Sequence, residues 1–129
     1  MTIEGSQAMS DTIIRDDIDL DIWRERMRQN DKWGVQRHPN GTGLGVEWMP
    51  GLSVGLLRDY AKERCQGNSP ETDNWLDILM EEVFEAAAES QDEPLRDELV
   101  QVAAVVKAWI ETIDERRPLA GRVCEGAKP

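Results

Sequence analysis

The sequence predicts an all-α fold, a bundle of four helices. Four stretches place apolar residues at helical spacing, and no stretch alternates apolar and polar residues as a half-buried strand would. Glycine and proline residues separate the four stretches, so each can form its own helix and pack its apolar face on the others. With 129 residues the chain is long enough for one domain with a hydrophobic core.

The first helix is predicted over residues 16–32, and a long loop follows it. Apolar residues recur in it at Ile18, Ile22, Trp23 and Met27, and Gly34 is placed to end it. Residues 1–15 are polar and aperiodic, so we expect a flexible N-terminal segment. From Val35 to Gly51 glycine and proline are too frequent for a helix. Loops of that length inside a domain are usually functional or disordered.

The other three helices are predicted over residues 53–66, from Thr72 or Asp73 to residue 90, and over residues 94–114. Either Thr72 or Asp73 can cap the third helix, and Pro94 suits the first turn of the fourth. The residues expected to face inward are Leu56, Leu57, Tyr60 and Ala61; then Trp75, Leu76, Leu79, Met80, Val83, Ala86 and Ala87; then Leu95, Leu99, Val102, Val105, Val106, Trp109, Ile110 and Ile113. Residues 115–129, with Pro118, Gly121 and Gly126, read as a loose tail.

Charge and composition exclude several classes of function. The formal net charge is −11 and the pI is near 4.5, which argues against a nucleic-acid binder but leaves a nucleotide ligand open. No apolar run is long enough to span a membrane, and no signal peptide is evident. The two cysteines, Cys65 and Cys124, form no C-x-x-C pair and read as free thiols. We therefore expect a soluble cytoplasmic protein.

Carboxylates occur where the third and fourth helices should be apolar. At about 100° per residue, Glu98 falls inside the apolar arc of its helix, while Glu82, Glu85 and Glu89 lie within about 60° of one another on the flank of the third. A carboxylate that faces a core is costly unless its charge is compensated. A divalent cation is the simplest compensation, and carboxylate oxygens suit Mg²⁺ or Mn²⁺ better than zinc.

Two other interpretations of these carboxylates stay open. Glu98 could pair with an arginine of another helix, and the glutamates of the third helix could be a solvated face. Asp77 precedes Glu81 by four residues, a spacing at which like charges repel. Either a bound cation or a solvated face would explain how the chain tolerates that repulsion.

The pattern also resembles a known family. The motif E-E-x-x-E, a short spacer and E-x-x-D is typical of MazG-like nucleoside triphosphate pyrophosphohydrolases, in the all-α NTP pyrophosphatase superfamily. Here it reads Glu81-Glu82-Val83-Phe84-Glu85, then the twelve residues Ala86–Asp97, then Glu98-Leu99-Val100-Gln101. The run from Lys32 to Gly43 is similar to the family's first helix and following loop. The resemblance covers roughly residues 16–114, which we interpret as the catalytic helical domain.

The resemblance implies hydrolysis of a nucleoside or deoxynucleoside triphosphate to the monophosphate and pyrophosphate. It implies Mg²⁺, with Mn²⁺ as an alternative, held by Glu82, Glu85 and Glu98, and catalytic roles for these residues and Glu81, which would orient the attacking water. Gln101 stands where the family has an aspartate, so this fourth ligand position offers a metal ion an uncharged oxygen. The family also implies homodimers, often paired into homotetramers.

Substrate contacts are expected from basic and aromatic residues. Lys62 and Arg64 on the second helix are candidates for the outer phosphates, Trp33 and Trp48 for the base, and His38 for the base or a phosphate. The ordinary alternatives are solvated charges and packed tryptophans. At the level of function, the rivals are a non-catalytic acidic interaction module and a nucleotide-binding sensor that has lost activity through Gln101.

Overall fold

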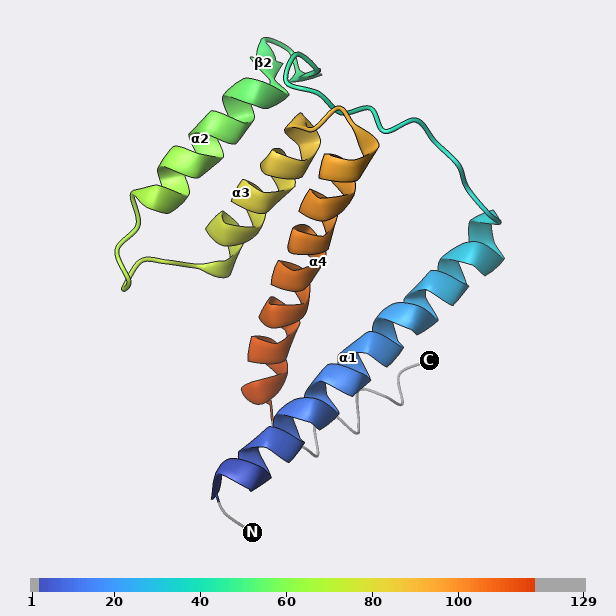
Figure 1. The fold of residues 1–129 in the computed structure, drawn as a ribbon, viewed down its shortest axis with the longest axis vertical. Coiled ribbons are helices and arrows are strands. Elements are labelled where there is room, and N and C mark those ends of the chain that lie inside the picture. The colour runs from blue at the N-terminus through green and yellow to red at the C-terminus, as the bar shows by residue number, and fades with distance from the viewer. Residues whose placement is uncertain (1–2, 118–129) are drawn as a thin grey trace. The chain divides into compact units, whose positions relative to one another are not determined.

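The computed structural model describes the backbone of residues 3–117 and the side chains of residues 15–117. This part of the chain is mostly helical (Figure 1), which confirms the all-α class. Its elements are helix α1 (Ile3–Trp33), strands β1 (Glu47–Met49) and β2 (Leu52–Ser53), and helices α2 (Val54–Gln66), α3 (Trp75–Ala88) and α4 (Asp92–Glu115). Most of the predicted tail, including Cys124, lies outside the described residues.

The chain divides into two compact units, which are described separately. One comprises residues 1–37 and 107–129, and the other comprises residues 38–106. Among the described side chains of the first unit, Ile18 of α1 is the most deeply buried, at 2% exposure. The end of α4 lies beside it, because Lys107 pairs with Asp19 and Glu111 pairs with Arg15.

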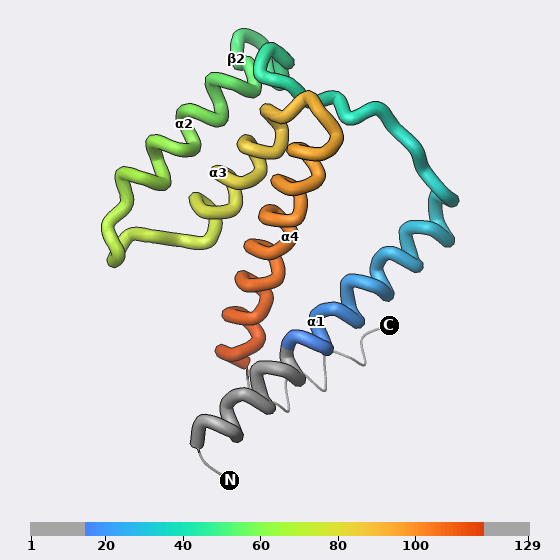
Figure 2. Tube along the Cα trace, viewed as in Figure 1, coloured from blue at the N-terminus to red at the C-terminus, as the bar shows by residue number. Residues whose placement is uncertain are grey.

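In the second unit α2 and α3 pack side by side and run in opposite directions (Figure 2). Its buried residues are Val54 and Ala61 of α2, Ala86 of α3 and Leu95 of α4, together with one charged residue, Asp77. Both helices begin with a side-chain cap. The Ser53 hydroxyl accepts from the Leu56 N–H, and the Asn74 carbonyl oxygen accepts from the Asp77 N–H. The cap of α3 is therefore Asn74, and the prediction of Thr72 or Asp73 was wrong.

The segment predicted as a long loop contains a short hairpin. Strands β1 and β2 pair antiparallel, with Met49 opposite Leu52. Pro50 and Gly51 make the turn, and Gly51 has a φ of 77°, which suits a glycine at the third position of a turn with proline at the second. Strands of two and three residues are too short to show an alternating pattern, so the sequence did not reveal them.

The part of the loop before the hairpin is held against the C-terminal end of α3. The Gly43 N–H donates to the Ala87 carbonyl at 2.8 Å, and the Thr42 hydroxyl donates to the Glu89 carbonyl at 2.6 Å. These bonds satisfy carbonyl groups that a helix C-terminus leaves without partners. The loop thus covers the C-terminal end of α3, which is the end nearer in sequence to the glutamates of that helix.

Two further expectations differ from the structure. Helix α1 begins at Ile3 instead of residue 16, and no proline interrupts residues 3–15 to prevent this extension. Several residues expected to face inward are exposed instead: Leu56, Tyr60, Leu76, Leu99 and Ile113. The apolar arcs of these helices are wider than the faces that the chain covers, so helical spacing located the helices but overestimated the core.

Candidate functional site

The half-buried carboxylates of α3 and α4 form the candidate site. Glu81, Glu82 and Glu85 lie on α3 and Glu98 lies on α4, and each is partly shielded from solvent. The pKa of Glu82 is raised, first by burial and then by the negative charges of Glu98, Glu81 and Glu85. Glu82 therefore interacts with carboxylates of its own helix and of α4.

Glu98 is perturbed in the same direction. Its pKa is raised by burial and then by Glu85, Glu89 and Asp97. Glu98 raises the pKa of Glu82, so the two carboxylates titrate as a coupled pair. All the charges that raise these two pKa values are carboxylates.

No arginine compensates this cluster within the described residues. The ion pairs found there involve other carboxylates, so the alternative in which Glu98 pairs with an arginine is not observed in this part of the chain. A group of three or more His, Cys, Asp or Glu side chains positioned to hold a metal ion is likewise not found among the described residues. The carboxylates raise one another's pKa values without forming such a group.

Glu81 faces a different neighbour. The Cys65 thiol of α2 hydrogen-bonds to Glu81, and this contact, with burial, raises the pKa of Cys65 to about 11. Cys65 thus keeps its proton at neutral pH and is a weak nucleophile. Glu81 lies on the α2 side of α3, whereas Glu82 is coupled to Glu98 of α4. Gln101, the fourth expected ligand, is exposed on α4.

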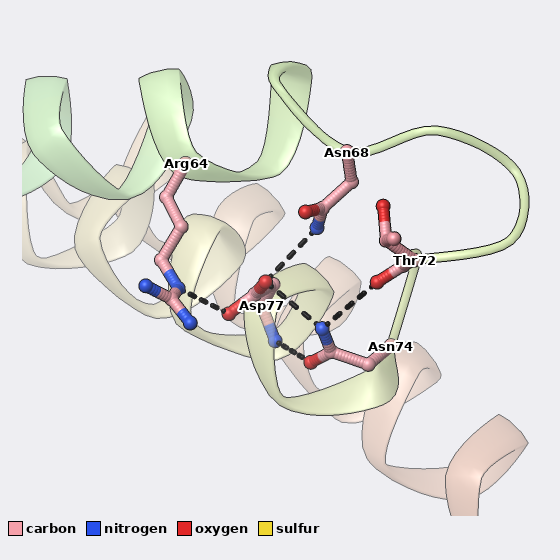
Figure 3. A network of polar contacts seen from close by, with 5 residues as sticks. All are labelled: Arg64, Asn68, Thr72, Asn74 and Asp77. Atoms are coloured by element: carbon pink, nitrogen blue, oxygen red, sulfur yellow. Dashed lines mark hydrogen bonds and ion pairs between the residues drawn. The ribbon is translucent and has the colours of Figure 1, made fainter.

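Asp77, the buried carboxylate of the second unit, lies one turn before Glu81 and has the opposite surroundings (Figure 3). It accepts hydrogen bonds from Arg64 Nε at 2.8 Å and from the Asn68 and Asn74 side-chain amides at 2.9 Å each. The Asn68, Arg64 and Asn74 hydrogen bonds lower the pKa of Asp77 to about 2. From the sequence we expected a bound cation or a solvated face to be the reason why the chain tolerates a charge at Asp77. The structure supports neither, because donors from α2 and from the loop before α3 compensate the charge of Asp77.

The expected substrate-binding residues are spread over the molecule. Arg64 pairs with the buried Asp77, a contact that was not among the expectations for it, and Lys62 is exposed on α2. Trp48 is 63% exposed and meets Phe84 of α3 edge to face, with ring centroids 6.3 Å apart. His38 is exposed. The second unit thus brings Trp48 to the helix that carries the glutamates.

Trp33 belongs to the other unit. The Lys32 ammonium lies 4.9 Å from the centroid of its ring, a cation–π contact. Trp33 also borders a hollow of about 240 Å³ at the end of α1, lined as well by Arg26, Gln29, Asn30, Gly34 and Gln36.

The chain matches no family model, no curated protein and no solved structure. Within residues 3–117, no helix has the length and apolar character needed to cross a membrane.

Proposed function

We propose that this protein is a Mg²⁺-dependent hydrolase that converts a nucleoside or deoxynucleoside triphosphate to the monophosphate and pyrophosphate. The observation that carries the proposal is the uncompensated pair formed by Glu82 and Glu98. Burial and neighbouring carboxylates raise both pKa values. Strained ionisable groups of this kind cluster at functional sites, because an unfavourable arrangement persists where a ligand gains from it.

The donor set fits a hard divalent cation. Glu82, Glu85 and Glu98 offer carboxylate oxygens, which Mg²⁺ and Mn²⁺ prefer, and repulsion among them would be relieved on binding. Since the described side chains do not form a group that could hold a metal ion, binding requires side-chain rotations that bring these carboxylates together. A cation held there would polarise phosphate oxygens and make a bound water easier to deprotonate.

Other residues of the second unit support the remaining roles. Glu81, restrained by Cys65 on the α2 side, is available to orient or deprotonate the attacking water. Of the two basic candidates Lys62 is the better one for the outer phosphates, because Arg64 is engaged with Asp77. The exposed ring of Trp48 offers a surface on which a base can stack.

The proposal extends to assembly and location. Exposed apolar residues on three helices of the second unit, Leu56 and Tyr60, Leu76, and Leu99, favour association into a homodimer or a dimer of dimers. A cytoplasmic location accords with a nucleotide substrate and with Cys65 as a free thiol.

A panel of canonical and modified triphosphates, assayed with Mg²⁺ and Mn²⁺ for pyrophosphate release, tests the proposal. Turnover should yield a monophosphate and pyrophosphate and should stop in EDTA. Glu63→Gln, on the exposed surface of α2, serves as a matched control that should leave turnover unchanged. Release of orthophosphate and a diphosphate would overturn the reaction type. Binding without turnover would indicate a nucleotide sensor, and neither binding nor turnover would indicate an interaction module.

A further inference from the structure

Residues 40–43, which we call the strap, hold the C-terminal end of α3. The Thr42 hydroxyl, which is part-buried, donates to the carbonyl of Glu89, the residue that caps α3. The Gly43 N–H donates to the Ala87 carbonyl. The last turn of a helix opens more easily than its middle, because its carbonyl groups lack partners within the helix. The strap supplies such partners at the end of α3.

The strap also holds the beginning of α4. The Asn40 side-chain amide donates to the carboxylate of Asp92, the first residue of α4, at 2.8 Å. Gly41 lies between the two donating side chains and has a φ of 71°, a backbone conformation that favours glycine. The strap therefore contacts both helix ends that residues 89–91 connect, and it does so within the unit of residues 38–106.

The chain that follows the strap is fixed to the start of α2. The Val54 N–H donates to the Val46 carbonyl at 2.7 Å, and the Gly55 N–H donates to the Leu44 carbonyl at 3.0 Å. A Cβ atom at Gly55 would lie 3.1 Å from the Leu44 oxygen, so glycine permits this close approach. The strap is thus an ordered part of the fold with its downstream end anchored.

Two of the proposed cation ligands lie near the helix ends that the strap holds. Glu85 is in the last turn of α3, and Glu98 is in the second turn of α4. The separation of their backbones therefore depends on how firmly the connection between the helices is held. Trp48, from the hairpin after the strap, packs on Phe84, the residue before Glu85. The same loop thus contacts α3 on both sides of Glu85 in the sequence.

We propose that Thr42 is a positioning residue, which holds the ends of α3 and α4 at a separation from which Glu85 and Glu98 can reach one divalent cation. The inference rests on the proposed function, because that function assigns these glutamates to a cation. Thr42 acts through the backbone of Glu89. It is better suited to this role than Asn40, because the Thr42 hydrogen bond is part-buried and that of Asn40 is exposed to water.

Isothermal titration of Mg²⁺ into folded full-length variants tests the positioning role. Thr42→Val keeps the shape of the side chain but removes the donor, so it should weaken Mg²⁺ binding by about fivefold. Thr42→Ser keeps the donor and should bind within about twofold of the wild type. Thr72→Val is the matched control, because it makes the same substitution in the loop before α3, where Thr72 accepts from the Ser69 N–H; its affinity should also stay within about twofold.

Hydrogen exchange without any cation tests the hold on the helix ends separately. Thr42→Val should speed the exchange of amides in residues 86–95 by at least about threefold and leave residues 75–82 unchanged. Thr72→Val should leave residues 86–95 unchanged. Asn40→Ala, which removes the exposed bond to Asp92, is a second variant and should change both measurements in the same direction as Thr42→Val, by a smaller factor.

The two measurements distinguish failure of this inference from failure of the proposed function. Unchanged exchange in residues 86–95 of Thr42→Val and Asn40→Ala would overturn the role of Thr42. Faster exchange with wild-type Mg²⁺ affinity would overturn it as well, and in both cases the proposed function would stand. A wild type that binds no Mg²⁺ would instead overturn the proposed function, on which the positioning role depends.

Discussion

Asp77 and Glu82 lie on the same helix, five residues apart, and their surroundings move their carboxyl pKa values in opposite directions. Asp77 is buried but receives hydrogen bonds from Asn68, Arg64 and Asn74, which lower its pKa to about 2. Glu82 is less buried, yet its pKa is raised, first by burial and then by neighbouring carboxylates, because no donor within the described residues compensates its charge as the three donors compensate that of Asp77. Burial alone therefore does not set the direction of a carboxyl pKa shift; the donors and charges around the carboxyl group decide it.

The comparison assigns different roles to the two ends of α3. At the N-terminal end the chain supplies every donor that the Asp77 carboxylate needs, so this corner fastens α3 to α2 and to the loop between them. Farther along, at Glu82 and across to Glu98, the repulsion is unrelieved within the described residues. An arrangement that costs stability in the absence of a ligand is what a cation site requires.

The largest expected effect is on turnover. Glu82→Gln, Glu85→Gln and Glu98→Gln should each reduce the rate of pyrophosphate release by at least about a hundredfold, because each removes a charge from a site that works by electrostatic stabilisation. Asp77→Asn should retain far more activity than any of the three. Near wild-type turnover in Glu98→Gln would show that its half-buried position is structural, and the comparison would fail.

The next effect is on stability at the other end of the helix. Asp77→Ala should lower the melting temperature markedly, because it leaves the Arg64 guanidinium and two amides without their shared acceptor. Asn74→Ala removes the cap and should cost about 1 kcal/mol, less than Asp77→Ala. Thermal denaturation followed by circular dichroism measures both. A larger loss for Asn74→Ala than for Asp77→Ala would show that the cap, and not the buried carboxylate, holds the corner.

The pH dependence of stability should separate the two carboxylates. Asp77 has a lowered folded pKa, so its contribution is present above the unfolded aspartate pKa, about 3.9, and is lost as the pH falls through about 2. Glu82 and Glu98 have raised folded pKa values, so the folded state binds more protons there and stability falls as the pH rises above about 4.3.

Glu82→Gln should therefore raise the melting temperature of the metal-free protein at pH 7, and this gain should vanish near pH 4. Thermal denaturation curves at the two pH values measure this gain in melting temperature. Glu63→Gln is the control, because it makes the same substitution at an exposed glutamate. If Glu82→Gln destabilises the protein equally at both pH values, Glu82 is not under electrostatic strain.

The smallest expected effect concerns Gln101. If this exposed residue can turn toward a cation shared with Glu98, Gln101→Asp should tighten Mg²⁺ binding or change the preference between Mg²⁺ and Mn²⁺. Isothermal titration with each metal measures both quantities. Unchanged affinity and selectivity would place Gln101 outside the set of ligands.

The sequence predicted the helices well because their signals are local. Helical spacing and the breaks at Gly34, Gly67 and Pro70 depend on neighbouring residues, and they located α2, α3 and α4 within a few positions. The role of Asp77 was missed because its partners lie nine and thirteen residues away on other segments, and nothing local shows that they converge. An Asn-x-x-Asp spacing at a helix start was the available signal, since it places a cap and its partner together.

The candidate site was only partly predictable for a related reason. Helical geometry shows that Glu81 and Glu82 point about 100° apart, but which neighbour each one meets depends on packing. The structure gives Glu81 the Cys65 thiol and couples Glu82 to Glu98. The sequence likewise could not predict that Leu56 and Tyr60 are exposed, because an apolar helix face does not reveal whether another part of the chain covers it.

The central claim is that the Glu82–Glu98 cluster, unlike the Asp77 corner, binds a divalent cation. Isothermal titration of Mg²⁺ into the wild type, Glu82→Gln and Asp77→Asn at pH 7, each confirmed as folded by circular dichroism, tests it directly. The account predicts saturable binding to the wild type, affinity at least about tenfold weaker for Glu82→Gln, and affinity within about twofold of the wild type for Asp77→Asn. Equal Mg²⁺ affinity in the wild type and Glu82→Gln, or no binding to either, would contradict it.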